Sequence, residues 1–107
     1  ELGVDRVLTS GLKPKAMEGI EMIKYLQDKY GDRIEILAGS GMNATNAKEM
    51  MDRTGICQVH SSCKGWRNDL TTSGKFVNYC FASEPHQNDY DVVDEKLVRK
   101  IVNSIWI

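Results

Sequence analysis

Three short β-rich runs stand out in the pattern of hydrophobic and polar positions. Residues 4–10 read V-D-R-V-L-T-S and end at Gly11, where a turn can begin. Residues 33–38 carry three aliphatic side chains and lead into a glycine-rich turn. A third run covers residues 56–61. The pattern therefore predicts three β-strands.

Apolar positions between these runs recur every three or four residues, which is the period of an amphipathic helix. In the first such segment they are Ala16, Ile20, Ile23, Leu26 and Tyr30. Gly31 is expected to end this helix. Asn43 and Thr45 are both favourable N-cap residues for a second helix, which is expected to end near Gly55.

Strands that alternate with helices through short connections are typical of parallel βαβ units, which predicts an α/β fold. The pattern changes over residues 62–90, which are mostly polar and predict a long loop. Asp91 is the expected N-cap of a closing helix over residues 92–105. The apolar stripe of this helix consists of Leu97, Val98, Ile101 and Ile105.

The length of 107 residues suits one small domain. A sheet of three parallel strands leaves both edges unpaired. The side chains expected to face inward, Val7, Ile36 or Leu37, and Val59, would lack opposing strands. We therefore expect a single partial domain over residues 1–107, which reduces its exposed apolar surface by forming a homo-oligomer.

Charge and composition narrow the possible partners. Acidic and basic residues nearly cancel, at 15 against 14, and no run of like charge predicts a nucleic-acid or membrane footprint. The apolar stretches are too short to span a bilayer, and no leader opens the chain. The odd count of cysteines, Cys57, Cys63 and Cys80, favours reduced thiols. These features predict a soluble, cytoplasmic protein.

Three ordered motifs carry a family resemblance. V-D-R-V-L-T-S-G at residues 4–11, R-I-E-I-L-A-G-S-G-M-N at 33–43 and Q-V-H-S-S at 58–62 resemble the second half of CutC proteins. The resemblance implies the C-terminal portion of a (β/α)₈ TIM barrel, of which this chain supplies the last three βα units and the closing helix. It departs from the family pattern at Ser40, where a second consecutive glycine is usual, and at Gln58, where glutamate is usual.

Two neighbouring loops form the candidate anion-binding site. In (β/α)₈ barrels the functional groups lie at the carboxyl ends of the strands, and phosphate is often held after the seventh and eighth strands. Gly39, Ser40 and Gly41 would bring backbone N–H groups close to an anion, beside the positive end of the following helix. Ser61 lies in the second loop. The alternative is a plain tight βα turn.

His60 is the candidate catalytic residue. It lies near the carboxyl end of the third strand, and its pKa range suits proton transfer near neutral pH. The alternative is a histidine that is hydrogen-bonded to a neighbouring strand and only completes the barrel. Thr9 and Ser10 share the same face and could orient a substrate, whereas Asp5 and Arg6 favour a structural ion pair.

Cys57-x-x-His60-x-x-Cys63 suggests a metal site, because thiolate and imidazole suit Cu(I) or Zn(II). Side chains alternate along a strand, so Cys57 and His60 are expected on opposite faces, with Cys57 buried as a small apolar residue. His60 with Cys63 remains the candidate metal pair. Of the five methionines, only Met42 falls at the presumed functional face.

Three functions remain open at this point. The family resemblance implies copper homeostasis in the cytosol, with Cu(I) as the bound ion. The turn and His60 favour a barrel enzyme that acts on a small phosphorylated or otherwise anionic metabolite. The incomplete sheet is also compatible with an inactive truncated product.

Overall fold

The structure is a computed structural model that describes residues 2–68 and 89–105. The chain divides into two compact units. The first consists of Glu1–Ser61 together with Arg99–Ile107, and the second of Ser62–Val98. None of the helices in the described ranges has the length and apolarity that a membrane crossing needs.

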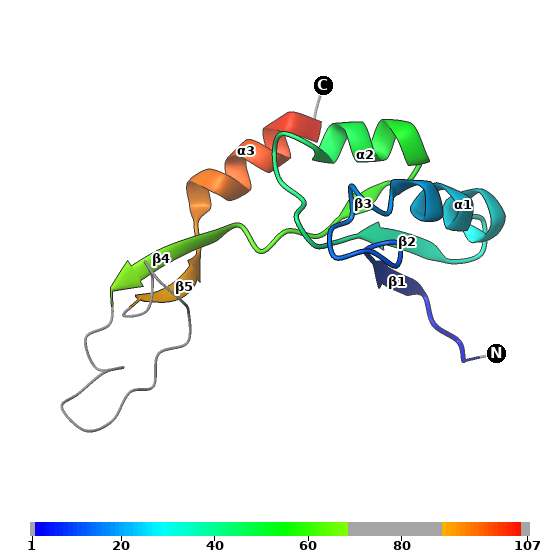
Figure 1. Cartoon of the computed structure of the whole chain (residues 1–107), viewed down its shortest axis with the longest axis horizontal. Helices are drawn as coiled ribbons and strands as arrows, with labels where there is room; N and C mark the ends of the chain where they lie inside the picture. Colours follow the sequence, from blue (N-terminus) through cyan, green and yellow to red (C-terminus); the bar gives the residue numbers. More distant parts are fainter. Residues whose placement is uncertain (1, 69–88, 106–107) are drawn as a thin grey trace. The chain divides into compact units, whose positions relative to one another are not determined.

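The first unit contains the predicted parallel sheet (Figure 1). Its strands are β1 (Arg6–Thr9), β2 (Glu35–Ala38) and β3 (Gln58–Val59), hydrogen-bonded in the order β1-β2-β3. The prediction of three parallel strands is confirmed, although each strand is shorter than expected. In the part of the chain that the structure describes, these strands form an open sheet and no closed barrel.

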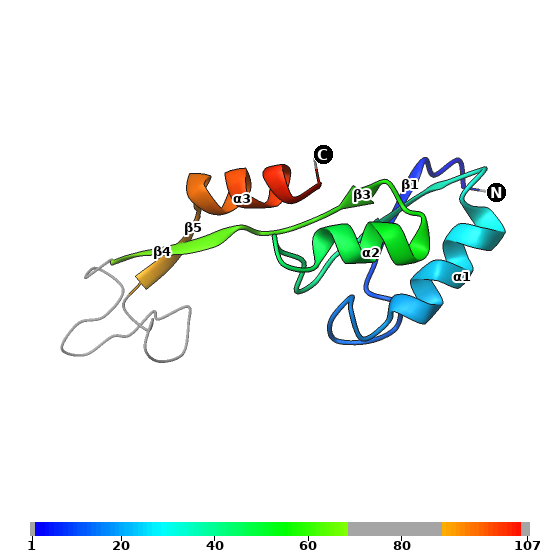
Figure 2. The same cartoon turned by 90° about the horizontal axis from the view of Figure 1, so that it is seen from above.

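Helices α1 (Ile20–Tyr30) and α2 (Ala47–Thr54) lie on the same side of this sheet, as Figures 1 and 2 both show. The buried apolar side chains of this layer are Ala16, Ile20, Ile23, Ile36, Ala38, Met42, Ala47, Met50 and Ile56. This burial is what stabilises two short helices that would be marginal alone.

The register of the strands separates the two faces of the sheet, because paired residues in parallel strands point the same way. Ile36 and Ala38 are buried beneath the helices, so their partners Val7 and Val59 share the helix-covered face. Val7, Ile36 and Val59 were expected to face the barrel interior, which is the side of the sheet away from the helices. This expectation is therefore wrong. Leu37, the alternative to Ile36, lies on the other face, which no described helix covers.

This uncovered face carries Leu8 and Leu37 at its centre, and Leu8 is 56% exposed. Leu8 and Leu37 are in-register partners on β1 and β2, and Gln58 is the partner of Leu37 on β3. The uncovered face is defined here by these three residues together with Arg6, Glu35 and His60.

The α2 helix ends where the sequence predicts. Gly55 has a φ of 84°, and its N–H donates to the carbonyl of Met51 at 2.8 Å. A left-handed residue after a helix favours glycine, since a Cβ would be strained there. Both helices begin later than predicted, because the preceding residues form turns.

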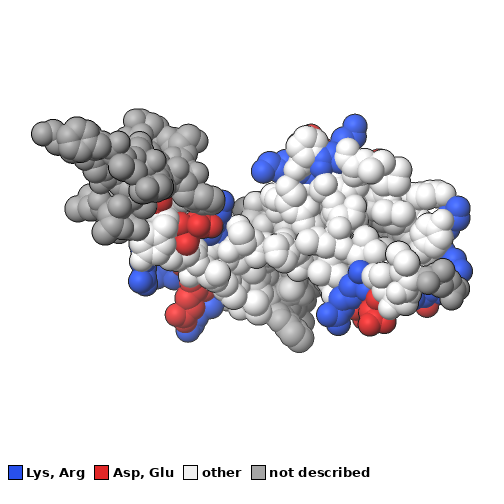
Figure 3. All heavy atoms as spheres, turned by 90° about the horizontal axis from the view of Figure 1, so that it is seen from below, with Lys and Arg blue, Asp and Glu red and all other residues white. Residues whose placement is uncertain are grey.

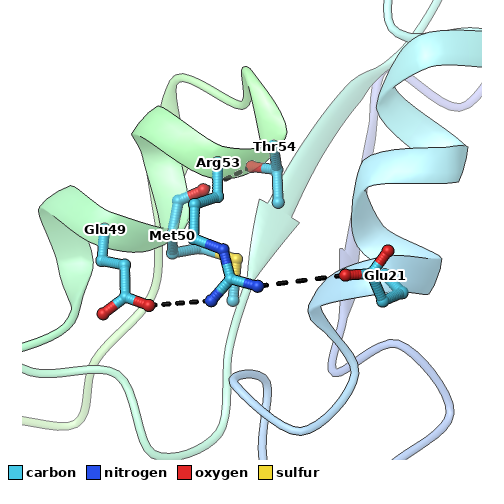
Figure 4. Close-up of polar contacts among 5 residues, drawn as sticks. All are labelled: Glu21, Glu49, Met50, Arg53 and Thr54. Carbon is cyan, nitrogen blue, oxygen red and sulfur yellow. Dashed lines mark hydrogen bonds and ion pairs between the residues drawn. The ribbon is translucent and has the colours of Figure 1, made fainter.

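One polar cluster joins α2 to α1 (Figure 4). Arg53 contacts Glu49 at 2.8 Å in the same helix and Glu21 of α1 at 3.9 Å. Thr54 donates from Oγ1 to the carbonyl of Met50 at 2.6 Å. The ion pairs are solvent-exposed and contribute little, on the order of 0.2–1 kcal/mol each. Burial of Met50 dominates the contact, since this side chain is fully buried.

The second unit corrects the prediction of one long loop over residues 62–90. Strands β4 (Lys64–Asn68) and β5 (Asp89–Val93) pair antiparallel, so both ends of that segment are extended. Each strand is short and mixed in polarity, and its stabilising partner is distant in the sequence. The hydrophobic periodicity of these two segments therefore does not predict either strand. The centre of the predicted loop, with Cys80, lies outside the described residues.

Helix α3 (Glu95–Ile105) begins after Asp94, not after Asp91. The Oδ1 atom of Asp94 accepts a hydrogen bond from the N–H of Lys96 at 2.8 Å, which satisfies one of the free donors at the helix start. Asp91 instead pairs with Trp66 across the β4–β5 ladder. The predicted N-cap was therefore three residues too early.

Candidate functional site

Two loops at the carboxyl ends of β1 and β2 are tied together. Ser40 donates from Oγ to the carbonyl of Pro14 at 2.6 Å, and the N–H of Ala16 donates to the carbonyl of Ser40 at 2.9 Å. These bonds join the loop after β1 to the turn after β2. Since both loops follow adjacent parallel strands, they form one rim of the first unit.

The candidate anion-binding turn is strained. Ser40 has a φ of 80° and Gly41 a φ of 76°, so both lie in the left-handed region. For a residue with a Cβ this conformation costs about 1–2 kcal/mol. Leu12, in the neighbouring loop, has a φ of 69°. The backbone at position 40 is thus one that favours glycine, the residue that the family resemblance leads one to expect there.

The turn also presents free hydrogen-bond donors. Within residues 2–68 and 89–105, the N–H groups of Ser40, Gly41 and Met42 donate no hydrogen bond to a protein atom. Ser40 and Gly41 are exposed. The N–H of Gly39 differs, because it donates to the carbonyl of Thr9 at 3.1 Å and belongs to the sheet ladder. Two of the three predicted turn residues therefore offer donors to a ligand.

The helix after this turn does not point at it directly. Asn46 donates from Nδ2 to the carbonyl of Gly41 at 2.9 Å, and its Oδ1 accepts from the N–H of Asn43 at 2.9 Å. Asn43 in turn accepts from the N–H of Thr45 at 2.9 Å. These bonds close a separate turn before α2 begins at Ala47, so the expected contribution of the helix N-terminus is displaced from Gly41.

His60 lies beside the same turn. Its N–H donates to the carbonyl of Ala38 at 2.8 Å, which extends the β2–β3 pairing by one residue. A Cβ placed on Gly39 would lie 3.6 Å from the Cβ of His60 and 2.6 Å from Cδ1 of Leu8. His60 is therefore on the uncovered face, exposed, next to the candidate anion-binding turn. Half-buried Ser61 follows it in the chain.

The structure does not support Cys57 as a buried residue. Cys57 is exposed, because it precedes β3 at the outer edge of the sheet, where no further described strand covers it. It lies two residues before Val59, on the helix-covered side, and lines a small cavity with Gln27 and Ile36. The expectation that Cys57 and His60 point to opposite faces agrees with this placement.

Other predicted metal ligands are not gathered by the first unit. Cys63 lies in the second unit, so the pairing of His60 with Cys63 stays a prediction. Met42 is only 4% exposed, so its thioether is not presented at the rim. Among the residues that the structure describes, no three His, Cys, Asp or Glu side chains lie close enough to hold a metal ion.

A polar network that the sequence did not predict crosses the uncovered face. Arg6 donates from Nε to Oε2 of Glu35, and Gln58 donates from Nε2 to the same oxygen at 2.8 Å. These two hydrogen bonds lower the pKa of the Glu35 carboxyl, and the bond to Glu35 raises the pKa of Arg6. Arg6 therefore pairs across the sheet with Glu35 and not, as expected, with Asp5.

The network lies at the amino ends of β1 and β2, away from His60. Only knowledge of the strand register could have found it, since Arg6 and Glu35 are in-register partners 29 residues apart.

The two hydroxyl groups predicted to orient a substrate form local hydrogen bonds. Thr9 Oγ1 accepts from the N–H of Gly11 at 3.0 Å, and Ser10 Oγ donates to the carbonyl of Lys13 at 2.6 Å.

Charge on the surface is mixed. On the face drawn in Figure 3, basic and acidic side chains lie interspersed over the described residues. This distribution agrees with the formal net charge of −1. A net charge of −1 does not favour anion binding by itself, so a local site such as the turn must rely on the groups that line it.

Known proteins resemble this chain over most of its length. A relative from Photobacterium profundum is 38% identical over 92 residues, which cover 86% of this chain and 35% of that protein. A relative from Glaesserella parasuis serovar 5 is 33% identical over 105 residues, 98% of this chain and 42% of that protein. The chain thus spans less than half the length of these relatives.

A third relative, from Pasteurella multocida, is 49% identical over 67 residues, 63% of this chain and 28% of that protein. All three are named as family protein CutC. The sequence model of the same family matches residues 1–65. This stretch includes all three strands of the parallel sheet, both helices that cover it, and His60. The chain therefore belongs to the CutC family.

Proposed function

We propose that this chain is part of a CutC-type (β/α)₈ barrel protein of copper homeostasis in the cytosol. Within that protein, we assign it a binding site for a small anion at the carboxyl ends of its strands. Family membership supports the cellular role. The parallel sheet with helices on one face supports the barrel, since such sheets are stable when the other face is enclosed by further strands.

A single observation carries the anion site: the exposed residues Ser40 and Gly41 have unused N–H donors, and Gly39 of the same turn lies beside His60. Backbone N–H groups bind oxyanions well because they are fixed in place and need no side-chain ordering. An imidazole close to them can hydrogen-bond the same ligand or transfer a proton to or from it. This combination suits a phosphorylated or carboxylate metabolite.

Direct copper binding is the second candidate function. It is favoured by the exposed free thiol of Cys57, because thiolates are preferred ligands of Cu(I). Copper would then be cargo, and the described residues supply isolated ligands in place of a gathered site. Tight binding would require ligands from other residues or a second copy of the chain.

Calorimetric titration separates the two candidates. Inorganic phosphate is titrated into the chain and into the His60→Ala variant, and Cu(I) into the chain and a Cys57→Ala variant. We expect phosphate to bind the wild-type chain and to bind His60→Ala at least about fivefold more weakly, with unchanged circular dichroism. Absence of phosphate binding to a folded wild-type chain, with one Cu(I) per chain lost in Cys57→Ala, would favour copper instead.

A further inference from the structure

Lys15 lies against the candidate anion-binding turn. A Cβ placed on Gly41 would lie 2.9 Å from Cδ of Lys15, and 3.6 and 3.7 Å from its Cβ and Cγ. The methylene chain of Lys15 therefore lies over the Cα of Gly41, in the space that the absent side chain leaves. The ammonium nitrogen Nζ is two bonds beyond Cδ. Because Cδ is already at the turn, the charge is carried close to it.

The backbone on both sides of Lys15 is held to the same turn. The carbonyl of Pro14 accepts from Ser40 Oγ, and the N–H of Ala16 donates to the carbonyl of Ser40. The residue before Lys15 and the residue after it are thus both hydrogen-bonded to Ser40. Placing the ammonium near a ligand at the turn then costs less conformational entropy than it would for a lysine on a free loop.

The charge of Lys15 is also unused. In the described ranges, Lys24 and Lys48 form ion pairs with Asp28 and Asp52, whereas Lys15 forms none. Lys15 is exposed, so its ammonium is hydrated and available to a ligand. An unpaired cation beside unused N–H donors combines a full positive charge with neutral hydrogen-bond donors, an arrangement that suits an oxyanion.

We infer that Lys15 is the charged binding residue of the rim site, and that it selects phosphate-type dianions over monoanionic carboxylates. The inference rests on the proposed anion site and extends it. Backbone donors at Ser40 and Gly41 recognise any oxyanion, but they carry no net charge. A neighbouring ammonium gains more from a dianion than from a monoanion, since the attraction scales with the product of the charges.

The test uses Lys15→Met, which keeps the stem over Gly41 and removes the charge. Lys13→Met is the matched control, since Lys13 lies in the same loop. Inorganic phosphate and acetate are titrated separately into each protein by calorimetry at low ionic strength. We expect Lys15→Met to bind phosphate at least about fivefold more weakly, with a smaller change for acetate, and Lys13→Met to stay within about twofold of wild type.

The outcomes distinguish this inference from the function on which it rests. A folded wild-type chain that binds neither anion overturns the anion site itself. A wild-type chain that binds phosphate, with Lys15→Met equal to it, overturns only the role of Lys15. Equal weakening by Lys13→Met would also overturn it, because the effect would then reflect net charge. Lys15→Arg, which restores the charge, is expected to recover most of the phosphate affinity.

Discussion

Ser40 shows how one residue can combine strain with a compensating bond. Its left-handed φ is unfavourable, but Oγ hydrogen-bonds the carbonyl of Pro14 and ties two loops together. A net hydrogen bond contributes about 1 kcal/mol, similar to the strain. Serine is therefore tolerated at a position whose backbone favours glycine. The conformational cost of its left-handed φ is offset by the hydrogen bond that joins the two loops.

Two substitutions of Ser40 separate these contributions. Ser40→Ala loses the hydrogen bond and keeps the strain, so we expect it to be destabilised by about 1 kcal/mol. Ser40→Gly loses the same bond but relieves the strain, so we expect it to stay close to wild type. Urea unfolding measures both. A glycine variant no more stable than the alanine variant would show that position 40 is not strained.

Cys57 is a residue whose setting depended on its neighbours. Strand alternation predicts that Cys57 faces away from His60 and is buried as a small apolar residue, which requires a further strand paired with the free edge of β3. In the first unit β3 is an edge strand of only two residues, which leaves the thiol exposed. The order of the strands in the sheet therefore determines whether Cys57 is a buried packing residue or an exposed thiol.

At the scale of elements, α3 illustrates how a helix start is selected. Asp91 and Asp94 are both good N-cap residues by type, and the helix start predicted from the sequence was at Asp91. Pairing of β5 with β4 keeps Asp91 extended, so the helix begins only after Asp94. A distant strand thus decided between two locally equivalent signals.

Alanine substitution at the two aspartates tests this assignment. We expect Asp94→Ala to destabilise the chain by about 1 kcal/mol, because it removes the acceptor for the N–H of Lys96. Asp91→Ala, at an exposed strand position, should change stability by less than about 0.5 kcal/mol. Thermal unfolding followed by circular dichroism measures both. The reverse order would place the N-cap at Asp91 after all.

At the scale of the whole molecule, the sheet of the first unit has properties of an interface. Both β1 and β3 are edge strands, and exposed edges readily pair with other chains. The uncovered face adds Leu8, which is more than half exposed. Within residues 2–68 and 89–105, the chain therefore has apolar surface and unpaired strand edges that a partner could cover.

We expect the purified chain to self-associate. Sedimentation velocity should show a weight-average mass that rises with concentration, and Leu8→Lys should shift the distribution towards monomer, because it adds a charge to the uncovered face. Leu12→Lys, at a loop position that is 84% exposed, is the control and should not. A wild-type monomer at all concentrations, with cooperative unfolding above about 5 kcal/mol, would contradict this expectation.

The sequence by itself determined the features that depend on neighbouring residues. Runs of β-forming residues identified the three strands of the parallel sheet, apolar spacing and N-cap residues identified the three helices, and Gly55 marked the end of α2. The motifs around Ser40 and His60 led to the family that the comparisons confirm. Such signals are local, because hydrophobic period and left-handed backbone act within a few residues.

Only the tertiary structure decided which distant residues meet. It assigned Arg6 to Glu35, paired β4 with β5 across the predicted loop, exposed Cys57 and laid Lys15 over Gly41. Each outcome depends on strand register or on how two loops are joined. A shift of one residue in a strand moves its side chains to the other face, so these contacts follow from the assembled sheet and not from any single segment.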